Sequence, residues 1–361
     1  MPVQMQNPSA RAQAQQESPL VDYHGAKIPA WYSDPVTEHS AVRNAAGLFD
    51  FSFRSKFTAK GSDRVRFLHG MISNDVKGLA PGRGNYATLL DARGHILADL
   101  YIYCEEDQFI IDTDADLIEK VLQTLGRYNI GGRTPLERMN ISALSIQGPK
   151  ARAILQSALG GELPGPEEFS HISMKLAGQS VRVARAGNTG EEGYEVWAEG
   201  AALQIVSNAL LERGSHEGLI WCGCHALEIL RIEAGVAEYG AELAEDTLPL
   251  EAGLFNALSF NKGCYIGQEI VERARSRGRV NWNLAGLTIE ASQAPKAGEK
   301  ILHDGKEIGE ITSACVSPSL MKTIALAYLR KEVSEPGTGL ALASGPAAFV
   351  TIIPFYQRAV S

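Results

Sequence analysis

The segment Lys262–Glu269 reads Lys-Gly-Cys-Tyr-Ile-Gly-Gln-Glu and is the most informative stretch of this 361-residue chain. Its two glycines predict a backbone that turns tightly or lets another part of the chain approach closely. The thiol of Cys264 lies beside Lys262 and upstream of Arg273 and Arg275, where positive charge would favour the thiolate. The alternative is a turn in which Cys264 is a small buried hydrophobic residue. The local residues alone favour this alternative.

The composition is that of a globular protein, with 45% hydrophobic and 21% charged residues. The length predicts about two or three domains. A net charge of −8 argues against nucleic acid as a general partner, and no apolar run approaches the ~20 residues that cross a membrane. Five irregularly spaced cysteines without a secretory signal predict free thiols in a reducing compartment, the cytoplasm. Residues 1–19 are rich in Gln and Ala and predict a disordered tail.

Hydrophobic periodicity predicts a mixture of helices and strands over residues 20–283. Three residues are candidate helix caps, Thr37, Ser62 and Asp114. The runs Asp99–Cys104 and Phe109–Thr113 predict two strands of a hairpin. Further helices are expected over 150–159, 201–213 and 225–234, and further strands over 180–186 and 194–198.

The pattern changes from about Leu284 to short β-branched runs separated by turn residues. Asp304-Gly305 lies between Ile301 and Ile308 and is a typical two-residue hairpin turn. Residues 284–361 therefore predict a small all-β domain, either a barrel or a sandwich.

Two carboxylates are candidate site residues. Asp99 follows a glycine-containing turn at the start of a strand, where it could face a pocket and act as a base. Glu195 alternates with Tyr194 and Val196, so its side chain points away from theirs. An inward carboxylate at Glu195 could accept two parallel hydrogen bonds from a flat heterocycle that carries N–H groups. For both residues the alternative is a solvated surface position.

Cys222, Cys224 and His225 are close in sequence and raise the question of a metal site. Structural zinc sites use four ligands in recurring pairs, and the sequence has no evident second Cys/His pair. Packing in the core is the favoured interpretation, and no metal site is predicted.

Arginines occur at every second position in a run formed by Arg273, Arg275, Arg277 and Arg279. On an extended strand all four would project from one face and could bind a carboxylate tail, a phosphate or nucleic acid. On a helix they would scatter. The alternative function is a charged edge strand that resists aggregation, and the residues favour neither alternative.

Four segments together resemble the superfamily of the glycine cleavage T-protein (aminomethyltransferase) and the YgfZ-type folate-binding proteins. They are Phe67–Val76, Leu89–Leu100, Arg185–Glu195 and Lys262–Glu269. The last segment resembles the K-G-C-Y/F-x-G-Q-E signature of the YgfZ type. The resemblance implies an α+β fold, a three-domain ring with tetrahydrofolate in its opening. It also implies two intertwined α+β subdomains over residues 20–283 and a C-terminal antiparallel β-barrel over residues 284–361.

The resemblance also implies roles for single residues. Asp99 falls where T-proteins have the acidic residue near the reacting folate nitrogen, and Tyr86 matches a tyrosine that lines the folate pocket. Glu195 matches the carboxylate that grips the pterin. The implied catalytic residues are Cys264 and Asp99, and the implied folate-binding residues are Tyr86, Asp99, Glu195, Lys262, Arg273 and Arg275. The cofactor that the resemblance implies is tetrahydrofolate, with a single glutamate or a polyglutamate tail that the arginines would meet.

Several positions depart from the T-protein pattern, which usually has Asn at Asp112, Tyr at Asn188, Arg at Leu227 and Tyr at Val236. It also has a carboxylate at the position of Ala98. These departures favour folate binding over aminomethyl transfer. The implied main function is therefore that of a YgfZ-like protein supporting iron–sulfur cluster assembly or repair, with client or assembly proteins as partners.

Two other functions stay open. One is a tetrahydrofolate-dependent aminomethyl- or methyltransferase, in which Asp99 acts at the reacting nitrogen. The other is a non-catalytic module that binds RNA or a protein through the arginine face. The net charge of −8 makes this last function the weakest of the three.

Overall fold

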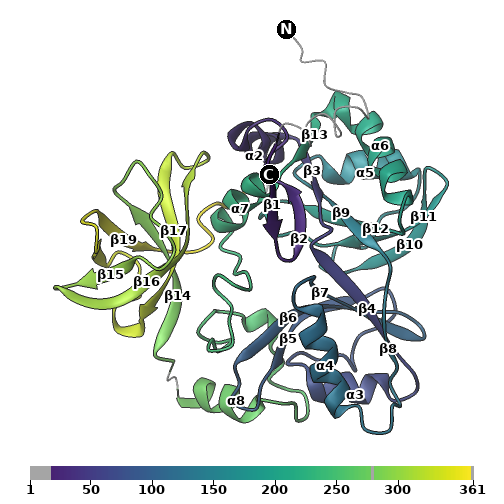
Figure 1. Ribbon diagram of the computed structural model, residues 1–361, viewed down its shortest axis with the longest axis horizontal. Coiled ribbons are helices and arrows are strands. Elements are labelled where there is room, and N and C mark those ends of the chain that lie inside the picture. Colours follow the sequence, from purple (N-terminus) through teal and green to yellow (C-terminus); the bar gives the residue numbers. More distant parts are fainter. Residues whose placement is uncertain (1–17, 278–279, 359–361) are drawn as a thin grey trace. The chain divides into compact units, whose positions relative to one another are not determined.

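The computed structural model describes residues 18–277 and 280–358 (Figure 1). The chain divides into two compact units. Unit 1 consists of Met1–Arg64, Leu79–Asn85 and Tyr101–Glu228, and unit 2 consists of Val65–Gly78, Tyr86–Leu100 and Ile229–Ser361. No helix among the described residues is long and apolar enough to cross a membrane.

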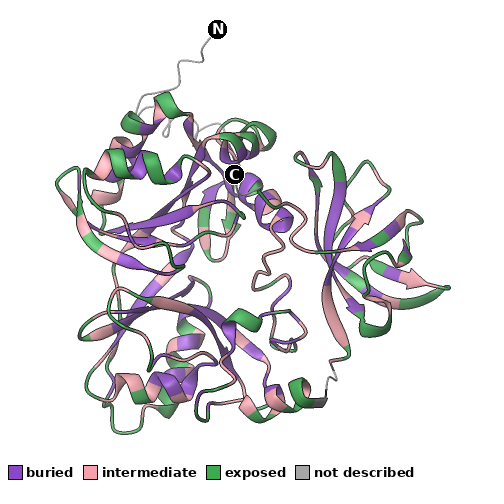
Figure 2. Cartoon of the chain, turned by 180° about the vertical axis from the view of Figure 1, so that it is seen from behind, coloured by how far each residue is buried: buried purple, intermediate pink, exposed green. Residues whose placement is uncertain are grey.

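A six-stranded sheet lies in unit 1, with the order β10-β11-β12-β9-β3-β13. Its neighbours pair antiparallel except β13, which runs parallel to β3. Helices α5 and α6 bury apolar side chains against this sheet, such as Ile154 and Leu210 against Leu144 and Val196. Figure 2 shows buried residues along the strands and exposed ones on the outer helices. The bounds are β3 (Ala46–Asp50), β9 (Ser142–Gln147), β10 (His171–Leu176), β11 (Gln179–Arg185), β12 (Gly193–Ala198), β13 (Leu219–Cys222), α5 (Ala151–Leu159) and α6 (Ala202–Gly214).

A five-stranded sheet has the order β5-β6-β7-β4-β8. Its strands β5 and β6 each contain residues of both units. The predicted hairpin is confirmed, because Tyr101 pairs with Asp112 and Cys104 with Phe109. The bounds are β4 (Arg54–Lys60), β5 (Gly84–Leu90), β6 (Ile96–Cys104), β7 (Gln108–Asp114) and β8 (Leu136–Arg138). The remaining elements before residue 223 are β1 (Leu20–Tyr23), β2 (Ala26–Pro29), α2 (Pro35–Asn44), α3 (Arg64–Met71), α4 (Ile118–Tyr128) and η1 (Ser215–Glu217).

The C-terminal part of unit 2 forms a closed barrel with the strand order β14-β17-β16-β15-β18-β19. Strand β14 pairs with both β17 and β19, which closes it. Alternate side chains such as Leu287, Ile311 and Val350 fill the interior. The predicted antiparallel barrel is confirmed. The bounds are α7 (Cys224–Glu233), η2 (Phe255–Ala257), α8 (Gln268–Arg277), β14 (Trp282–Ile289), β15 (Lys300–His303), β16 (Lys306–Ser317), β17 (Lys322–Arg330), η3 (Lys331–Val333), β18 (Gly339–Leu342) and β19 (Ala347–Thr351).

The end of α7 is tied to the outside of the barrel within unit 2. Ile232 packs with Cys315, Ile324 and Leu326 in a second apolar cluster. The Arg231 guanidinium donates to Ser313 Oγ at 2.7 Å and to Glu242 Oε2 at 3.0 Å. Side chains 82 residues apart in sequence therefore share one buried polar network.

Two of the predicted caps are wrong and one turn is confirmed. Asp34, not Thr37, caps α2, because its carboxylate accepts hydrogen bonds from the Val36 and Thr37 amides. Asp114 does not cap α4 through its side chain, since its carboxylate binds Arg54 instead. His303 pairs with Lys306, so the residues between them form the expected two-residue turn.

Some expectations fall outside the described residues or stay predictions. Residues 1–17 of the predicted tail are not among the described residues, whereas Pro19 accepts a hydrogen bond from the Ala30 amide. The predicted division of the chain at residues 283 and 284 stays a prediction.

Candidate functional site

Unit 1 contains a cluster of buried charges between strands β4, β7 and β12. Lys56 Nζ lies 2.7 Å from Asp112 Oδ2 and 3.6 Å from Glu195 Oε2, and all three side chains are at most 3% exposed. Arg54 binds Asp112 Oδ1 and Asp114 Oδ1, each at 2.7 Å. The alternation of β4 places both cations on one face, so that they meet the acids of the paired strand β7.

Aromatic rings surround this cluster. The indole Nε1 of Trp197 donates to Glu195 Oε2 at 2.8 Å, from a position two residues along the same strand. Lys56 Nζ lies 4.8 Å from the Trp197 ring centroid, and Arg54 lies 4.4 Å from that of Tyr101. The Tyr103 hydroxyl is buried and has no hydrogen-bond partner among the described residues. Within the described part of the chain, the cluster therefore leaves one buried hydroxyl donor without an acceptor.

Burial raises the pKa of the Glu195 carboxyl above its usual value. Lys56 opposes this rise, Asp112 adds to it, and Arg54 together with the Trp197 hydrogen bond lowers the pKa again. Burial also raises the pKa of Tyr103, and the negative charges of Glu195 and Asp112 raise it further. The protonation of Glu195 thus depends on charges from two neighbouring strands.

Asp99 and Tyr86 come together within unit 2. The Tyr86 hydroxyl donates to Asp99 Oδ2 at 3.3 Å, and the Asp99 side chain is buried. The backbone of Tyr86 is held in turn, because Asn74 Nδ2 donates to its carbonyl at 2.8 Å. Tyr86 and Asp99, which the resemblance assigned to the folate pocket, are therefore in direct contact.

Lys262 is a buried residue that bonds to the backbone. Its Nζ donates to the carbonyls of Ile72 at 2.6 Å and Asn74 at 2.8 Å, directly after helix α3. Burial lowers the pKa of this ammonium to about 8, with a smaller opposing effect from Asp75. The ammonium thus fixes the same short segment that holds Tyr86, and its contact with a folate tail stays a prediction.

The second glycine of the Lys262–Glu269 segment packs against the turn between β5 and β6. Gly267 has φ of +84°, and a Cβ there would lie 2.7 Å from the Asp91 carbonyl oxygen. Gly94 of that turn has φ of +80°, and a Cβ added there would lie 3.0 Å from the Ile270 Cβ. The predicted close backbone approach is therefore real for Gly267. Cys264 is exposed, so it is not the buried packing residue of the alternative interpretation.

The arginine run does not form a strand. Arg273 and Arg275 lie on helix α8, where positions two apart point in nearly opposite directions. Arg273 pairs with Glu269 at 2.6 Å, and Arg275 lies 4.0 Å from the Phe260 ring centroid. The prediction that these arginines project from one face of a strand is therefore wrong. Arg279 lies outside the described residues.

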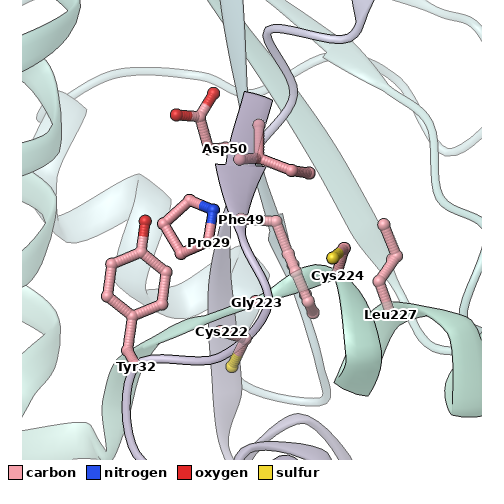
Figure 3. Close-up of a pocket in the computed structure, with 9 residues that line it drawn as sticks. Pro29, Tyr32, Phe49, Asp50, Cys222, Gly223, Cys224 and Leu227 are labelled. Carbon is pink, nitrogen blue, oxygen red and sulfur yellow. The ribbon is translucent and has the colours of Figure 1, made fainter. Parts of the chain in front are cut away.

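A small pocket in unit 1 has none of the predicted site residues in its lining (Figure 3). The open space between its lining residues, including solvent, is about 200 Å³. Leu227, where the resemblance led us to expect Arg in a T-protein, is part of its wall. The thiols of Cys222 and Cys224 are buried in the same region. The lining residues are Ile28, Pro29, Tyr32, Phe49, Asp50, Cys222, Gly223, Cys224 and Leu227.

Sequence reasoning missed the cations of the Glu195 cluster. Arg54, Lys56 and Thr58 occupy every second position of β4 and so share one face of the strand. Polar residues in this pattern ordinarily indicate a face exposed to solvent. The signal was available in the neighbouring strand, because Asp112 and Asp114 show the same spacing. Two cations and two acids at matching intervals on paired strands indicate a buried ion network.

Two family models match this chain. The GCVT N-terminal domain matches residues 10–262, and the glycine cleavage T-protein C-terminal barrel domain matches residues 283–356. The aminomethyltransferase of Geobacillus sp. (strain WCH70) is 34% identical, and the match covers 94% of this chain and 95% of that protein. The aminomethyltransferase of Bacillus subtilis (strain 168) is 32% identical, with 94% and 95% covered.

A solved structure agrees with these relatives. The glycine cleavage system aminomethyltransferase T from Bartonella henselae superposes with a TM-score of 0.87 at 26% identity. The match covers 97% of this chain and 98% of that one. The α+β fold with its terminal barrel is therefore shared along nearly the whole length.

These relatives correct the main functional prediction. A role in iron–sulfur cluster assembly or repair rested on one short segment, whereas relatives matched over 94% of the chain are named aminomethyltransferase. The more specific likeness to YgfZ-type proteins is not confirmed. Agreement along the whole chain outweighs both the Lys262–Glu269 segment and the departures at single positions. The chain belongs to the glycine cleavage T-protein family.

Proposed function

We propose that this protein is a tetrahydrofolate-dependent one-carbon transferase that moves an aminomethyl or methyl group. The observation that carries the proposal is the end-to-end match to proteins named aminomethyltransferase. The contact between Asp99 and Tyr86 supports it, because it supplies a buried carboxylate beside an aromatic hydroxyl. Transfer of a one-carbon unit to an amine nitrogen needs a group that takes up the released proton.

Asp99 would be the acid/base residue at the reacting nitrogen. Its carboxylate would accept the proton that leaves an attacking amine, or balance the positive charge that develops there. The Tyr86 hydroxyl, 3.3 Å away, would orient this carboxylate, and the Tyr86 ring would pack against a flat ligand. General acid/base groups of this kind contribute about 10²–10⁴-fold to rates.

Glu195 would bind the pterin of tetrahydrofolate, whose N–H edge needs an acceptor. Its Oε2 already accepts a hydrogen bond from Trp197, whereas no described residue donates to Oε1. The buried Tyr103 hydroxyl, which has no partner among the residues that the structure describes, is a second polar group that a ligand or a water could satisfy. The available residues fit a flat polar ligand, with one carboxylate oxygen left for it.

The roles proposed for the arginines in binding the folate tail and for the Cys264 thiol in catalysis have weaker support. Arg273 and Arg275 on α8 would meet a glutamate or polyglutamate tail, although each already has a partner on its own helix. Lys262 would add positive charge to the same region. Cys264 would be catalytic if its exposed thiol takes part in transfer. The free thiols of the described cysteines support a cytoplasmic location, which fractionation of the native cells would test.

The Lys262–Glu269 segment would serve the transferase by holding the turn that precedes Asp99. Gly267 packs on the Asp91 carbonyl, and Gly94 of the same turn packs on Ile270. We assign this positioning role to the segment in which the chain resembles YgfZ-type proteins.

The test is transfer of a labelled one-carbon unit to tetrahydrofolate. An aminomethyl-lipoyl donor and a methylated amine are offered separately to the wild-type protein and to Asp99→Asn. We expect turnover with one donor and a loss of about 10²–10⁴-fold in kcat for the variant. Asp107→Asn is the matched control, since Asp107 is exposed in the turn beyond the other end of β6 and should leave the rate unchanged.

Two further variants divide the proposal into parts. Glu195→Gln should weaken tetrahydrofolate binding in calorimetric titration, whereas Cys264→Ala tests the thiol in the transfer assay. Full activity of Cys264→Ala would remove that residue from the catalytic set. Tight binding of tetrahydrofolate without turnover on either donor would overturn the transferase and leave a binding protein.

A further inference from the structure

The carboxylate of Glu195 is anchored at one oxygen and open at the other. Its Oε2 takes the Trp197 indole at 2.8 Å and lies 3.6 Å from Lys56 Nζ, whereas no described residue donates to Oε1. The side chain is 3% exposed, so bulk water contributes little to keeping it charged. A buried carboxyl without a cation beside it takes up a proton and becomes a donor at that oxygen.

The charged and titratable groups around Glu195 come from several packed strands. Strand β4 supplies Arg54 and Lys56, β7 supplies Asp112 and Asp114, β6 supplies Tyr103 and β11 supplies Arg182. Lys56 contacts Asp112 and Glu195, and Arg54 contacts Asp112 and Asp114. Asp112 is therefore shared by both cations and competes with Glu195 for Lys56.

We propose that Lys56 and Asp112 are opposing positioning residues for ligand binding, Lys56 holding Glu195 as an ionised acceptor and Asp112 limiting that effect. This proposal rests on the proposed function in one respect, that the open Oε1 receives an N–H group of the folate ring. A flat ring with N–H donors gains a charge-assisted hydrogen bond from a carboxylate. It gains no such bond from a carboxylic acid that presents its own O–H.

The geometry explains why Lys56 suits this role. Its ammonium bears on Oε2, the oxygen already fixed by Trp197, and no hydrogen bond from it reaches Oε1. The ring of Trp197 lies 4.8 Å from Nζ and restricts where the ammonium can move. Lys56 can therefore stabilise the negative charge without occupying the oxygen assigned to the ligand.

A purely structural ion network makes a different prediction. If the cluster only stabilises the fold, removing Lys56 or Asp112 changes the stability of the protein. It also moves the protonation of Glu195, because a charge this close acts on the carboxyl in either case, but it leaves the pH profile of ligand binding where it was. The two roles therefore separate in ligand binding measured across pH, once a titration of Glu195 without ligand has located its midpoint.

Trp197 provides the readout for that titration. Its indole donates to Glu195, so its fluorescence should change when the carboxylate gains a proton. The pH transition is assigned by its absence in Glu195→Gln. We expect Lys56→Met to move the midpoint upward by about one pH unit or more, and Asp112→Asn to move it downward.

Lys60→Met is the matched control, because Lys60 lies on the same strand but is exposed and pairs with Glu137. Its midpoint should equal that of the wild-type protein. Asp112→Asn keeps the experiment decisive if Lys56→Met does not fold. That variant leaves Lys56 with Glu195 and Arg54 with Asp114, so each cation keeps one acid. Unchanged midpoints in the folded variants would overturn the proposal.

A second measurement links the midpoint to the ligand. Tetrahydrofolate binding, followed by calorimetry across the titration range, should weaken below the Glu195 midpoint of each variant. At the wild-type midpoint, Lys56→Met should bind about fivefold or more weakly if its midpoint moves up by a unit or more. Failure of wild-type protein to bind tetrahydrofolate would defeat the proposed function, whereas the Trp197 titration would still decide whether Lys56 and Asp112 set the ionisation of Glu195.

Discussion

Two lysines among the described residues are buried, and they differ in what surrounds the ammonium. Lys56 in unit 1 lies between two carboxylates, Asp112 and Glu195. Lys262 in unit 2 donates to two backbone carbonyls, those of Ile72 and Asn74. The carbonyls carry no net charge, so burial outweighs the smaller opposing effect of Asp75 and lowers the pKa of Lys262. The first arrangement suits electrostatic control of a ligand site, and the second suits a backbone clamp.

Lys56→Met should have the largest effect on stability in this comparison. Removing one member of a buried ion network leaves uncompensated charge and costs about 3–5 kcal/mol of unfolding free energy. Urea unfolding measures the loss. The double variant Lys56→Met/Asp112→Asn should recover much of it, because an unpaired acid is removed as well. A single variant as stable as wild type would show that Lys56 does not compensate these acids.

Gly267→Ala should have the next largest effect, and it asks whether the glycine or the ammonium holds the Lys262–Glu269 segment. A side chain at φ of +84° and 2.7 Å from the Asp91 oxygen should cost about 2 kcal/mol or more. Gly263→Ala is the matched control within the same segment. Its nearest neighbour would be His69 Nε2 at 3.9 Å, so stability should barely change. Equal effects of the two substitutions would contradict this assignment.

Lys262→Met should cost about 1–2 kcal/mol at pH 7, less than the loss of Lys56. The variant leaves two carbonyls without their charged donor, but it also relieves the burial of an ammonium. Chemical denaturation of both lysine variants under one set of conditions gives the comparison. A larger loss for Lys262→Met than for Lys56→Met would reverse the distinction between clamp and charge.

The smallest effect is the pH dependence of the Lys262 clamp. The folded pKa of about 8 lies below the ordinary 10.5, so the unfolded chain binds more protons between these values. The contribution of Lys262 to stability therefore rises as pH increases through 8 and is complete above 10.5. Solvent screening reduces it to about 1 kcal/mol. The stability difference between wild type and Lys262→Met should widen from pH 7 to pH 10, and a constant difference would contradict the lowered pKa.

Much of the fold follows from local sequence signals. The barrel strands, the Asp304-Gly305 turn and the hairpin after Asp99 are specified by alternation and by short-range turn chemistry. The caps failed where two nearby residues could each fill the role, as with Asp34 and Thr37. The prediction of a strand for the arginine run was wrong, although a spacing of two residues fits a strand. Arg273 and Arg275 pair with Glu269 and Glu272, four and three residues earlier, and such pairs support a helix.

The candidate site was harder to predict because its key contacts are long-range. Glu195 and Asp99 were predicted as site residues from their place on strands and by resemblance, and their roles stay predictions. The cations that surround Glu195 come from β4, about 140 residues earlier, and depend on the pairing of β4 with β7. Sequence alternation indicates which face a side chain occupies but not whether that face is covered. Burial turned an apparent solvent face into an ion network.

The polar network of Arg231 limits how freely the barrel can be exchanged between proteins. A fragment that begins at Trp282 would keep all six barrel strands. It would lose the Arg231 guanidinium, which donates to Ser313, and the Glu233 carboxylate, which accepts from Ser317. It would also uncover Cys315, Ile324 and Leu326, which pack against Ile232. A transplantable cassette would therefore have to begin before Arg231, at the end of α7, about fifty residues upstream of the first barrel strand.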